Sequence, residues 1–300
     1  MRLPLPAILF AVPLALLAAP AGAPPSPTSP PARVELAVDR VELAMGRIHG
    51  VVSVDVSIDG SGPYRFAIDW GANLFAISPR LAQALKLPRT GRDEMGNENV
   101  RVETLSLGGA RFLGLTAAVD PFFDDKEEQG VLGVNVYADL LMTLDYPRKL
   151  VVLERGSLPP ADGQTIFACD GGEDPEPTIE IMLGDKKIRA ILDTGASRFL
   201  MLPEKLSGEL PLKAAPVAAG VATGPQSGTL RPREARFAGM LRLGTISVRD
   251  PLLTFHPRPR AFIGSAFLEH FAVTLDQKGR RVRFATQSPM PITVPKAAWE

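Results

Sequence analysis

The sequence predicts an all-β (mainly) protein built from two pseudo-symmetric lobes. Proline (29) and glycine (27) are plentiful among its 300 residues, and strong helical periodicity is scarce. This composition favours short strands joined by turns. Three sequence blocks also occur twice, in the same order and with similar spacing. One such match can arise by chance, but three in order are hard to explain without an internal duplication.

The repeated blocks set the limits of the two lobes. The first block, YRFAIDWGANLF at residues 64–75, aligns with IRAILDTGASRF at residues 188–199. We therefore expect one lobe over residues 49–155, a second over residues 176–287, and a linker rich in Gly, Pro and Asp over residues 156–175. The other two blocks are LSLG (105–108) with LRLG (241–244), and VLG to MTLD (131–145) with FIG to VTLD (262–276).

Within each lobe the pattern predicts short strands and one short helix. The run VVSVDVSI at residues 51–58 alternates apolar and polar side chains, as a half-buried strand does. Pro79 and Pro203 each open a helical turn, because proline suits a first helical position. The further expectations are return strands at 64–68 and 188–192, a strand at 178–183, a strand at 165–168 in the linker, helices at 134–141 and 265–271, and closing strand pairs at 142–145 with 150–154 and 273–276 with 281–285.

The first 21 residues have the features of a secretory signal peptide. Arg2 is followed by an apolar run over residues 3–17 and by Ala-Pro-Ala at residues 19–21, where a signal peptidase would cut. We therefore expect an exported protein, periplasmic or secreted. No later apolar stretch is long enough to cross a bilayer, so no integral membrane span is expected after cleavage. Residues 22–48 are expected to form a Pro-rich linker or N-terminal extension, and residues 288–300 a C-terminal tail.

Composition excludes several classes of function. The 33 basic and 33 acidic side chains balance, which argues against nucleic-acid binding. A single cysteine, Cys169, and three scattered histidines cannot form a Cys/His metal cluster, so no metal and no cofactor are expected. A Gly-x-Ser-x-Gly motif is absent, which argues against a serine hydrolase. The acidic run at residues 124–128 is more typical of a solvated loop than of a metal site.

Asp69 and Asp193 are the candidate catalytic residues. Each ends an apolar strand and is followed by x-Gly-Ala, so two such loops can face each other across a pseudo-twofold axis. Two carboxylates held together share one proton, so one can take a proton from water while the other donates to a carbonyl oxygen. The residues expected to support the dyad are Gly71, Ala72, Thr194, Gly195, Ala196 and Ser197. Asp145 and Asp276 precede the last hairpin turns and are expected to cap them.

These motifs resemble the retropepsin-like aspartic proteases, in particular bacterial members with two copies of the domain in one chain. The matching residues are DWGA (69–72) and DTGA (193–196), each followed by an apolar-apolar-Gly block and by Thr-Leu-Asp. The resemblance implies a barrel-like lobe of six strands per copy and a dyad of Asp69 and Asp193. It also implies a cleft for a peptide or unfolded protein substrate, covered by flaps near residues 92–102 and 219–230. Because the second copy supplies the partner aspartate, a monomer is expected.

One residue departs from the family pattern. The family has Thr between Asp and Gly in both loops, where this chain has Thr194 in one and Trp70 in the other. Trp70 either points elsewhere and leaves a working dyad, or fills the space between the lobes and blocks the shared water. Three hypotheses follow: an aspartic endopeptidase, a non-catalytic peptide- or partner-binding module with Trp70 as an aromatic anchor, and a homodimer that pairs like aspartates.

Overall fold

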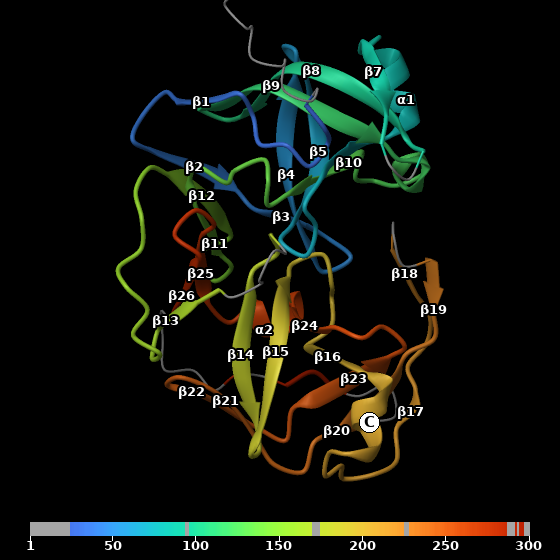
Figure 1. The fold of residues 1–300 in the computed structure, drawn as a ribbon, viewed down its shortest axis with the longest axis vertical. Coiled ribbons are helices and arrows are strands. Elements are labelled where there is room, and N and C mark those ends of the chain that lie inside the picture. Colours follow the sequence, from blue (N-terminus) through green and yellow to red (C-terminus); the bar gives the residue numbers. More distant parts are fainter. Residues whose placement is uncertain are drawn as a thin grey trace, which may run out of the picture.

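The computed structural model describes residues 25–93, 96–169, 175–224, 228–286, 292 and 294–296. The expected signal peptide and most of the expected C-terminal tail lie outside these residues. The described chain is mainly β, with two lobes that lie one above the other in Figure 1. Among the described residues no helix combines the length and hydrophobicity that a bilayer span requires. The helical elements are α1 (Pro79–Ala84), α2 (Ser265–Leu268) and the 3-10 turns η1 (Pro121–Phe123) and η2 (Glu204–Gly208).

The first lobe contains a closed ring of six strands. Hydrogen-bonded pairs run β9–β6–β10–β5–β4–β8, and β8 pairs again with β9. On β4, the alternate residues Val52, Val54 and Val56 are at most 2% exposed, as a strand with one face in a barrel interior requires. The lobe comprises β1 (Arg33–Leu36), β3 (Gly46–Ile48), β4 (Val51–Ile58), β5 (Ser61–Asp69), β6 (Phe75–Ile77), β7 (Arg89–Arg92), β8 (Glu98–Leu107), β9 (Ala110–Val119) and β10 (Gly130–Gly133).

The second lobe repeats this topology with two broken strands. The long hairpin β8–β9 of the first lobe corresponds to β20 with β23 and β21 with β22. The breaks fall at Gly239 and at Pro251, whose neighbour Asp250 has a φ of 51°; glycine and proline both weaken a strand interior. The strands are β14 (Thr178–Leu183), β15 (Lys186–Asp193), β16 (Leu200–Pro203), β17 (Val217–Ala218), β18 (Ala222–Gly224), β19 (Gly228–Leu230), β20 (Arg233–Arg236), β21 (Met240–Leu243), β22 (Ile246–Arg249), β23 (Leu252–His256) and β24 (Ala261–Gly264).

The closing hairpins of both lobes join in one shared sheet of six strands, ordered β13-β26-β25-β11-β12-β2. At its centre β11 pairs antiparallel with β25, so that Thr143 faces Thr274 and their hydroxyl oxygens lie 2.8 Å apart. Because these two residues are counterparts in the repeat, the pseudo-twofold axis passes between them. The strands are β2 (Arg40–Ala44), β11 (Leu141–Asp145), β12 (Leu150–Glu154), β13 (Ile166–Ala168), β25 (Ala272–Asp276) and β26 (Arg281–Ala285).

Two expectations about local structure are wrong. Residues 22–48 are not only a linker: residues 33–48 contribute β1, β2 and β3, and the carbonyl of Pro27 accepts a hydrogen bond of 2.9 Å from Phe75. Residues 134–141 do not form a helix but two successive turns before β11. Val134, Val136, Tyr137 and Leu140 are all at most 3% exposed, so the segment is packed into the core. The helix of the first lobe is instead α1, which Pro79 opens.

The segment between the lobes is tied to the shared sheet. Its strand β13 pairs with β26, and the backbone N–H of Leu158 donates to Asp276 Oδ2 at 2.9 Å. Asp276 Oδ1 also accepts from Gly279 at 2.7 Å, and Asp145 Oδ1 accepts from Arg148 at 3.1 Å. The expected capping of both closing turns by these aspartates is therefore confirmed.

Candidate active site

Asp69 and Asp193 occupy equivalent places in the two lobes. Asp69 ends β5 beside Gly133 of the parallel strand β10, and Asp193 ends β15 beside Gly264 of the parallel strand β24. Both glycines are tightly enclosed. A Cβ on Gly133 would lie 2.6 Å from the carbonyl oxygen of Ala72, and one on Gly264 would lie 2.0 Å from that of Arg198. The repeated apolar-apolar-Gly block thus lets each strand lie against the loop that follows each aspartate.

The two aspartate loops meet face to face. A Cβ on Gly71 would lie 2.6 Å from Asp193 Cγ, and a Cβ on Gly195 would lie 2.4 Å from Asp69 Oδ2. Each carboxyl group therefore packs against the glycine of the opposite loop, which explains why no larger residue fits at either position. The structure brings Asp69 and Asp193 of one chain together at the floor of the interlobe space.

Backbone amides hold the carboxyl groups in place. Gly71 donates to Asp69 Oδ1 at 2.8 Å, and Ala196 donates to Asp193 Oδ1 at 2.9 Å. The neighbouring Ser265 supports the second loop, since its hydroxyl donates to the carbonyl oxygens of Ala196 (3.1 Å) and of Gly50 in the first lobe (2.8 Å). Ser265 was not among the residues singled out from the sequence, although it directly follows the repeated glycine.

Burial and mutual proximity shift the pKa values of both aspartates. Burial raises the pKa of Asp69 above its ordinary value of 3.8, an effect that the amides of Gly71 and Gly195 and a hydrogen bond from Asp193 partly offset. Burial, followed by the negative charge of Asp69, raises the pKa of Asp193 well above that value. Two adjoining carboxyl groups whose pKa values move apart hold one proton between them. Of the two upward shifts in pKa, the one on Asp193 is the larger.

Thr194 forms the contact that links the two loops. Its hydroxyl donates to the carbonyl of Ile68 at 2.7 Å and accepts from the backbone N–H of Trp70 at 2.9 Å. It thereby holds the backbone on either side of Asp69. The side chain of Trp70 takes no part in this contact, so the clamp is made from one lobe only.

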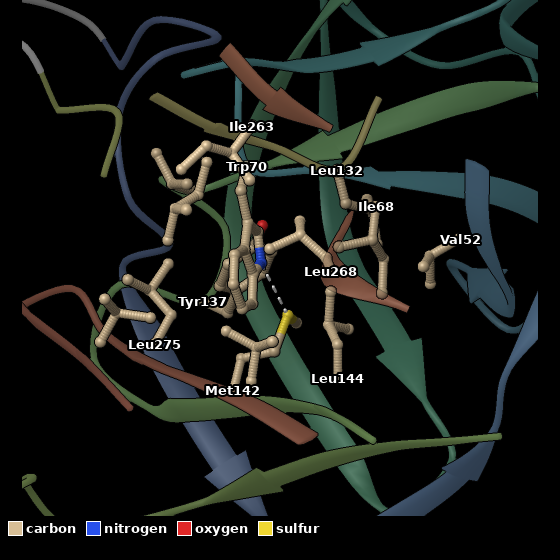
Figure 2. Packing of buried hydrophobic residues seen from close by; sticks show 14 of the residues in the cluster. Val52, Ile68, Trp70, Leu132, Tyr137, Met142, Leu144, Ile263, Leu268 and Leu275 are labelled. Carbon is tan, nitrogen blue, oxygen red and sulfur yellow. Dashed lines mark hydrogen bonds between the residues drawn. The ribbon is translucent and has the colours of Figure 1, made fainter. Parts of the chain in front are cut away.

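The indole of Trp70 points away from the aspartates into the core. Figure 2 shows the ring among buried side chains of both lobes, with its N–H directed at Met142. The Nε1–Sδ distance is 3.5 Å and the residue is 0% exposed. Trp70 is also not one of the residues that line the cavity above the dyad. The ring therefore lies neither between the carboxyl groups nor where a ligand in the cavity would touch it.

A cavity of about 840 Å³ lies over the two aspartates. Its lining includes Ala72 and Ser197 from the supporting loops. Asn97, beside the hairpin β7–β8, and Thr223, on the hairpin β18–β19, also line it. Both segments expected to form flaps thus border the cavity, and β18–β19 extends from the second lobe toward the first in Figure 1. Among the described residues, no group of three His, Cys, Asp or Glu side chains is placed to hold a metal ion.

A half-buried ion pair beside the second loop was not predicted from the sequence. Arg198 donates to Glu234 Oε1 at 2.8 Å and to the carbonyl oxygen of Ala219 at 3.0 Å, at the base of the second flap. Its counterpart in the first lobe is Leu74. The two side chains lie 36 positions apart, so neither motif nor spacing relates them, but the charged residue at a position that is apolar in the other copy was a visible signal.

The comparisons with known proteins agree with this geometry. Residues 54–136 match the family model for aspartyl proteases. This range runs from β4 to the turns after β10 and contains Asp69 and Gly71. No curated protein matches the chain. The first lobe is therefore similar to the domain of retropepsin-like aspartyl proteases.

Proposed function

We propose that this protein is an aspartic endopeptidase whose dyad consists of Asp69 and Asp193, one from each lobe. The observation that carries the proposal is the close packing of each carboxyl group against the glycine of the opposite loop, beneath a cavity of about 840 Å³. The family match of the first lobe supports the same reaction class. The pseudo-twofold arrangement supports a dyad formed within one chain, an origin by duplication, and function as a monomer.

The proposed reaction needs no covalent intermediate. Asp69, as the carboxylate, takes a proton from a water molecule held between the two acids, and the resulting hydroxide attacks the peptide carbonyl carbon. Asp193, as the acid, gives its proton to the carbonyl oxygen, which yields a neutral tetrahedral diol. Asp69 then transfers its proton to the amide nitrogen, a diol hydroxyl returns its proton to Asp193, and the C–N bond breaks. The dyad recovers its single shared proton, as catalysis requires.

The elements that border the cavity support an extended polypeptide as the substrate. Hairpin segments at Asn97 and Thr223 border it, and such backbone edges can hold an extended peptide through main-chain hydrogen bonds. We propose unfolded proteins or peptides as substrates and, from the N-terminal sequence, an exported enzyme. The position of Trp70 favours this reading over a binding module with an aromatic anchor, because the ring is 0% exposed.

The test is hydrolysis of a denatured protein by the mature chain across acid to neutral pH. Loss of a general acid or base typically costs about 10²–10⁴ in rate. We therefore expect Asp69→Asn and Asp193→Asn each to reduce peptide cleavage at least about 100-fold. A peptide mimic with a hydroxyl-bearing tetrahedral carbon should inhibit the wild type. Full activity in either variant, or no cleavage by a folded wild type at any pH, would refute the proposal.

A further inference from the structure

The two walls of the cavity are built from equivalent loops of opposite charge. The loop from β9 to β10 (residues 120–129) and the loop from β23 to β24 (residues 257–260) occupy corresponding places in the two lobes, since β9 pairs parallel with β6 as β23 does with β16. Both loops line the cavity, one through Glu128 and the other through Arg258. Their strands also supply the counterparts Val131 and Phe262 to the lining.

Glu128 presents an unsatisfied acid on the first wall. Its Oε2 atom is buried and accepts no hydrogen bond from the protein. A buried carboxylate oxygen without a donor is unfavourable, so a site of this kind is suited to an incoming cation. The apolar side chains of Phe122, Phe123 and Val131 line the same wall. Such a lining accommodates the aliphatic stem of a lysine or arginine while Glu128 meets its charged end.

The other charged groups on this wall do not neutralise Glu128. Asp120 also lines the cavity and adds negative charge, with Oδ1 accepting from the backbone of Phe122 at 2.9 Å. The ammonium of Lys126 lies 5.0 Å from the ring centroid of Phe122, and the residue is exposed. It forms no ion pair with Glu128. This wall therefore presents two acidic side chains, Asp120 and Glu128, and one basic side chain, Lys126, to the cavity.

Arg258 is the counterpart charge on the second wall. Among the described residues no carboxylate forms an ion pair with its guanidinium, and the backbone N–H of Arg258 donates to His256 Nδ1 at 3.2 Å. Burial, and then the charge of Arg258, lowers the pKa of His256 to about 4, so His256 is neutral at neutral pH. Besides the two aspartates and the charged side chains already named, the cavity lining contains the titratable side chain of His49, in the β3–β4 turn. Arg258 therefore provides the fixed charge of this wall.

We infer that the cleft selects and orients peptides by charge, with a basic side chain on the wall of Glu128 and an acidic side chain on the wall of Arg258, on opposite sides of the bond over the dyad. This inference rests on the proposed function. The near twofold symmetry of the backbone by itself allows a peptide to bind in either direction. Opposite charges on equivalent walls remove that ambiguity, because the reversed peptide brings like charges together.

The test uses peptides in which a neutral hydroxyethylene link replaces the central amide. Four of them differ only in the residues that flank this link: Lys/Glu, Glu/Lys, Lys/Lys and Gln/Gln. We expect one of the two oppositely charged orders to bind the wild type about 10-fold more tightly than Gln/Gln, and the reversed order to bind more weakly than Gln/Gln. Glu128→Gln should remove the preference on the basic side, and Arg258→Gln the preference on the acidic side.

A charge exchange makes the test decisive. The double variant Glu128→Lys with Arg258→Glu should prefer the reversed order. Asp125→Asn, in the same loop but with a side chain that is 93% exposed, and Arg249→Gln on β22 are matched controls that should leave the preference unchanged. Equal binding of both orders, or no binding of any peptide, overturns the inference. Cleavage of the corresponding Gln/Gln amide separately reports the peptidase activity, so the two proposals can fail independently.

Discussion

The hydroxyl of Thr194 in the second lobe accepts a hydrogen bond of 2.9 Å from the backbone N–H of Trp70 in the first lobe. The same hydroxyl donates to the carbonyl of Ile68 at 2.7 Å, so it holds the chain on both sides of Asp69. A twofold dyad with threonine in both loops has two such clamps. Because Trp70 directs its side chain into the core, it makes no equivalent clamp around Asp193, and the Thr194 hydroxyl holds the two loops together from one side.

Removing the Thr194 hydroxyl should therefore affect both stability and activity. Thr194→Val keeps the shape of the side chain but leaves the N–H of Trp70 and the carbonyl of Ile68 without a partner. We expect a loss of about 1–3 kcal/mol in the free energy of unfolding. We also expect a marked fall in kcat, because a displaced Asp69 no longer shares the water. Denaturant unfolding and peptide cleavage measure the two effects.

Thr143→Val is the matched control for this prediction. It also removes a hydroxyl that bridges the lobes, since Thr143 Oγ1 lies 2.8 Å from Thr274 Oγ1, but it does so in the shared sheet away from the cavity. It should lower stability with little change in kcat. An equal loss of kcat in both variants would mean that the clamp at Asp69 has no special role.

Trp70 should prove to be a core residue whose replacement costs stability. Trp70→Phe retains most of the packing and loses only the N–H contact to Met142, so the variant should fold and keep activity within a few-fold of wild type. Trp70→Ala opens a large cavity and should lower the free energy of unfolding by about 3–5 kcal/mol. Thermal melting and cleavage assays on the same samples distinguish these outcomes. Loss of activity in a well-folded Trp70→Phe protein would instead indicate a direct role of the indole.

The rate of cleavage plotted against pH should be bell-shaped and displaced to higher pH. Cleavage falls on the acid side as Asp69 becomes protonated and on the alkaline side as Asp193 loses its proton. Burial raises the pKa of Asp69 above 3.8 and raises that of Asp193 well above it. Both limbs of the profile should therefore lie at a higher pH than the range in which exposed aspartates titrate. The pH dependence of kcat/KM for one peptide measures both limbs. A profile with a single limb would contradict a dyad that shares one proton.

Folding stability should fall as the pH rises through the dyad's titration. The pKa of Asp193 is higher in the folded than in the unfolded chain, so its contribution is fully present below the ordinary value of 3.8 and is lost as the pH rises through the raised value. Asp193→Asn removes this ionisation and should flatten the upper part of the stability curve. Asp125→Asn, on the surface, should not. Melting temperatures from pH 3 to 9 provide the comparison.

Local and repeated features of this fold could be predicted from the sequence. The strand pattern around residues 51–58, the pairing of the closing strands and the capping by Asp145 depend on periodicity and turn chemistry within a short segment. The mutual approach of Asp69 and Asp193 followed from symmetry, since two copies of one loop can meet at an axis. Arguments that rest on adjacent residues or on a repeat therefore predicted much of the fold and the close approach of the two aspartates.

Features set by packing between distant segments could not be predicted. Residues 134–141 are apolar enough for a buried helix, yet they form turns that pack into the core. The strands in residues 33–48 depend on edges offered by β9, β12 and β4, which no local pattern reveals. The unsatisfied oxygen of Glu128 likewise follows from the path of a ten-residue loop and not from its acidic composition.

The last prediction concerns the ion pair between Arg198 and Glu234. The Glu234 side chain is 2% exposed, and its Oε1 also accepts from Thr254 at 3.1 Å, so loss of the arginine leaves a buried carboxylate without its counter-charge. Arg198→Met should lower the free energy of unfolding by about 3–5 kcal/mol. It should also release the carbonyl of Ala219 and speed amide exchange in β17, β18 and β19, which form and flank the second flap.

A surface pair serves as the control for Arg198. Lys187 and Glu180 lie 2.9 Å apart with side chains that are 69% and 51% exposed, so Lys187→Met should change stability by about 1 kcal/mol or less. If Arg198 positions the flap, its variant should raise KM more than it lowers kcat, because the dyad loop keeps its own amide contacts while the substrate loses part of its cover. A change confined to kcat, with amide exchange of the flap unaltered, would place the effect of Arg198 on the aspartates themselves.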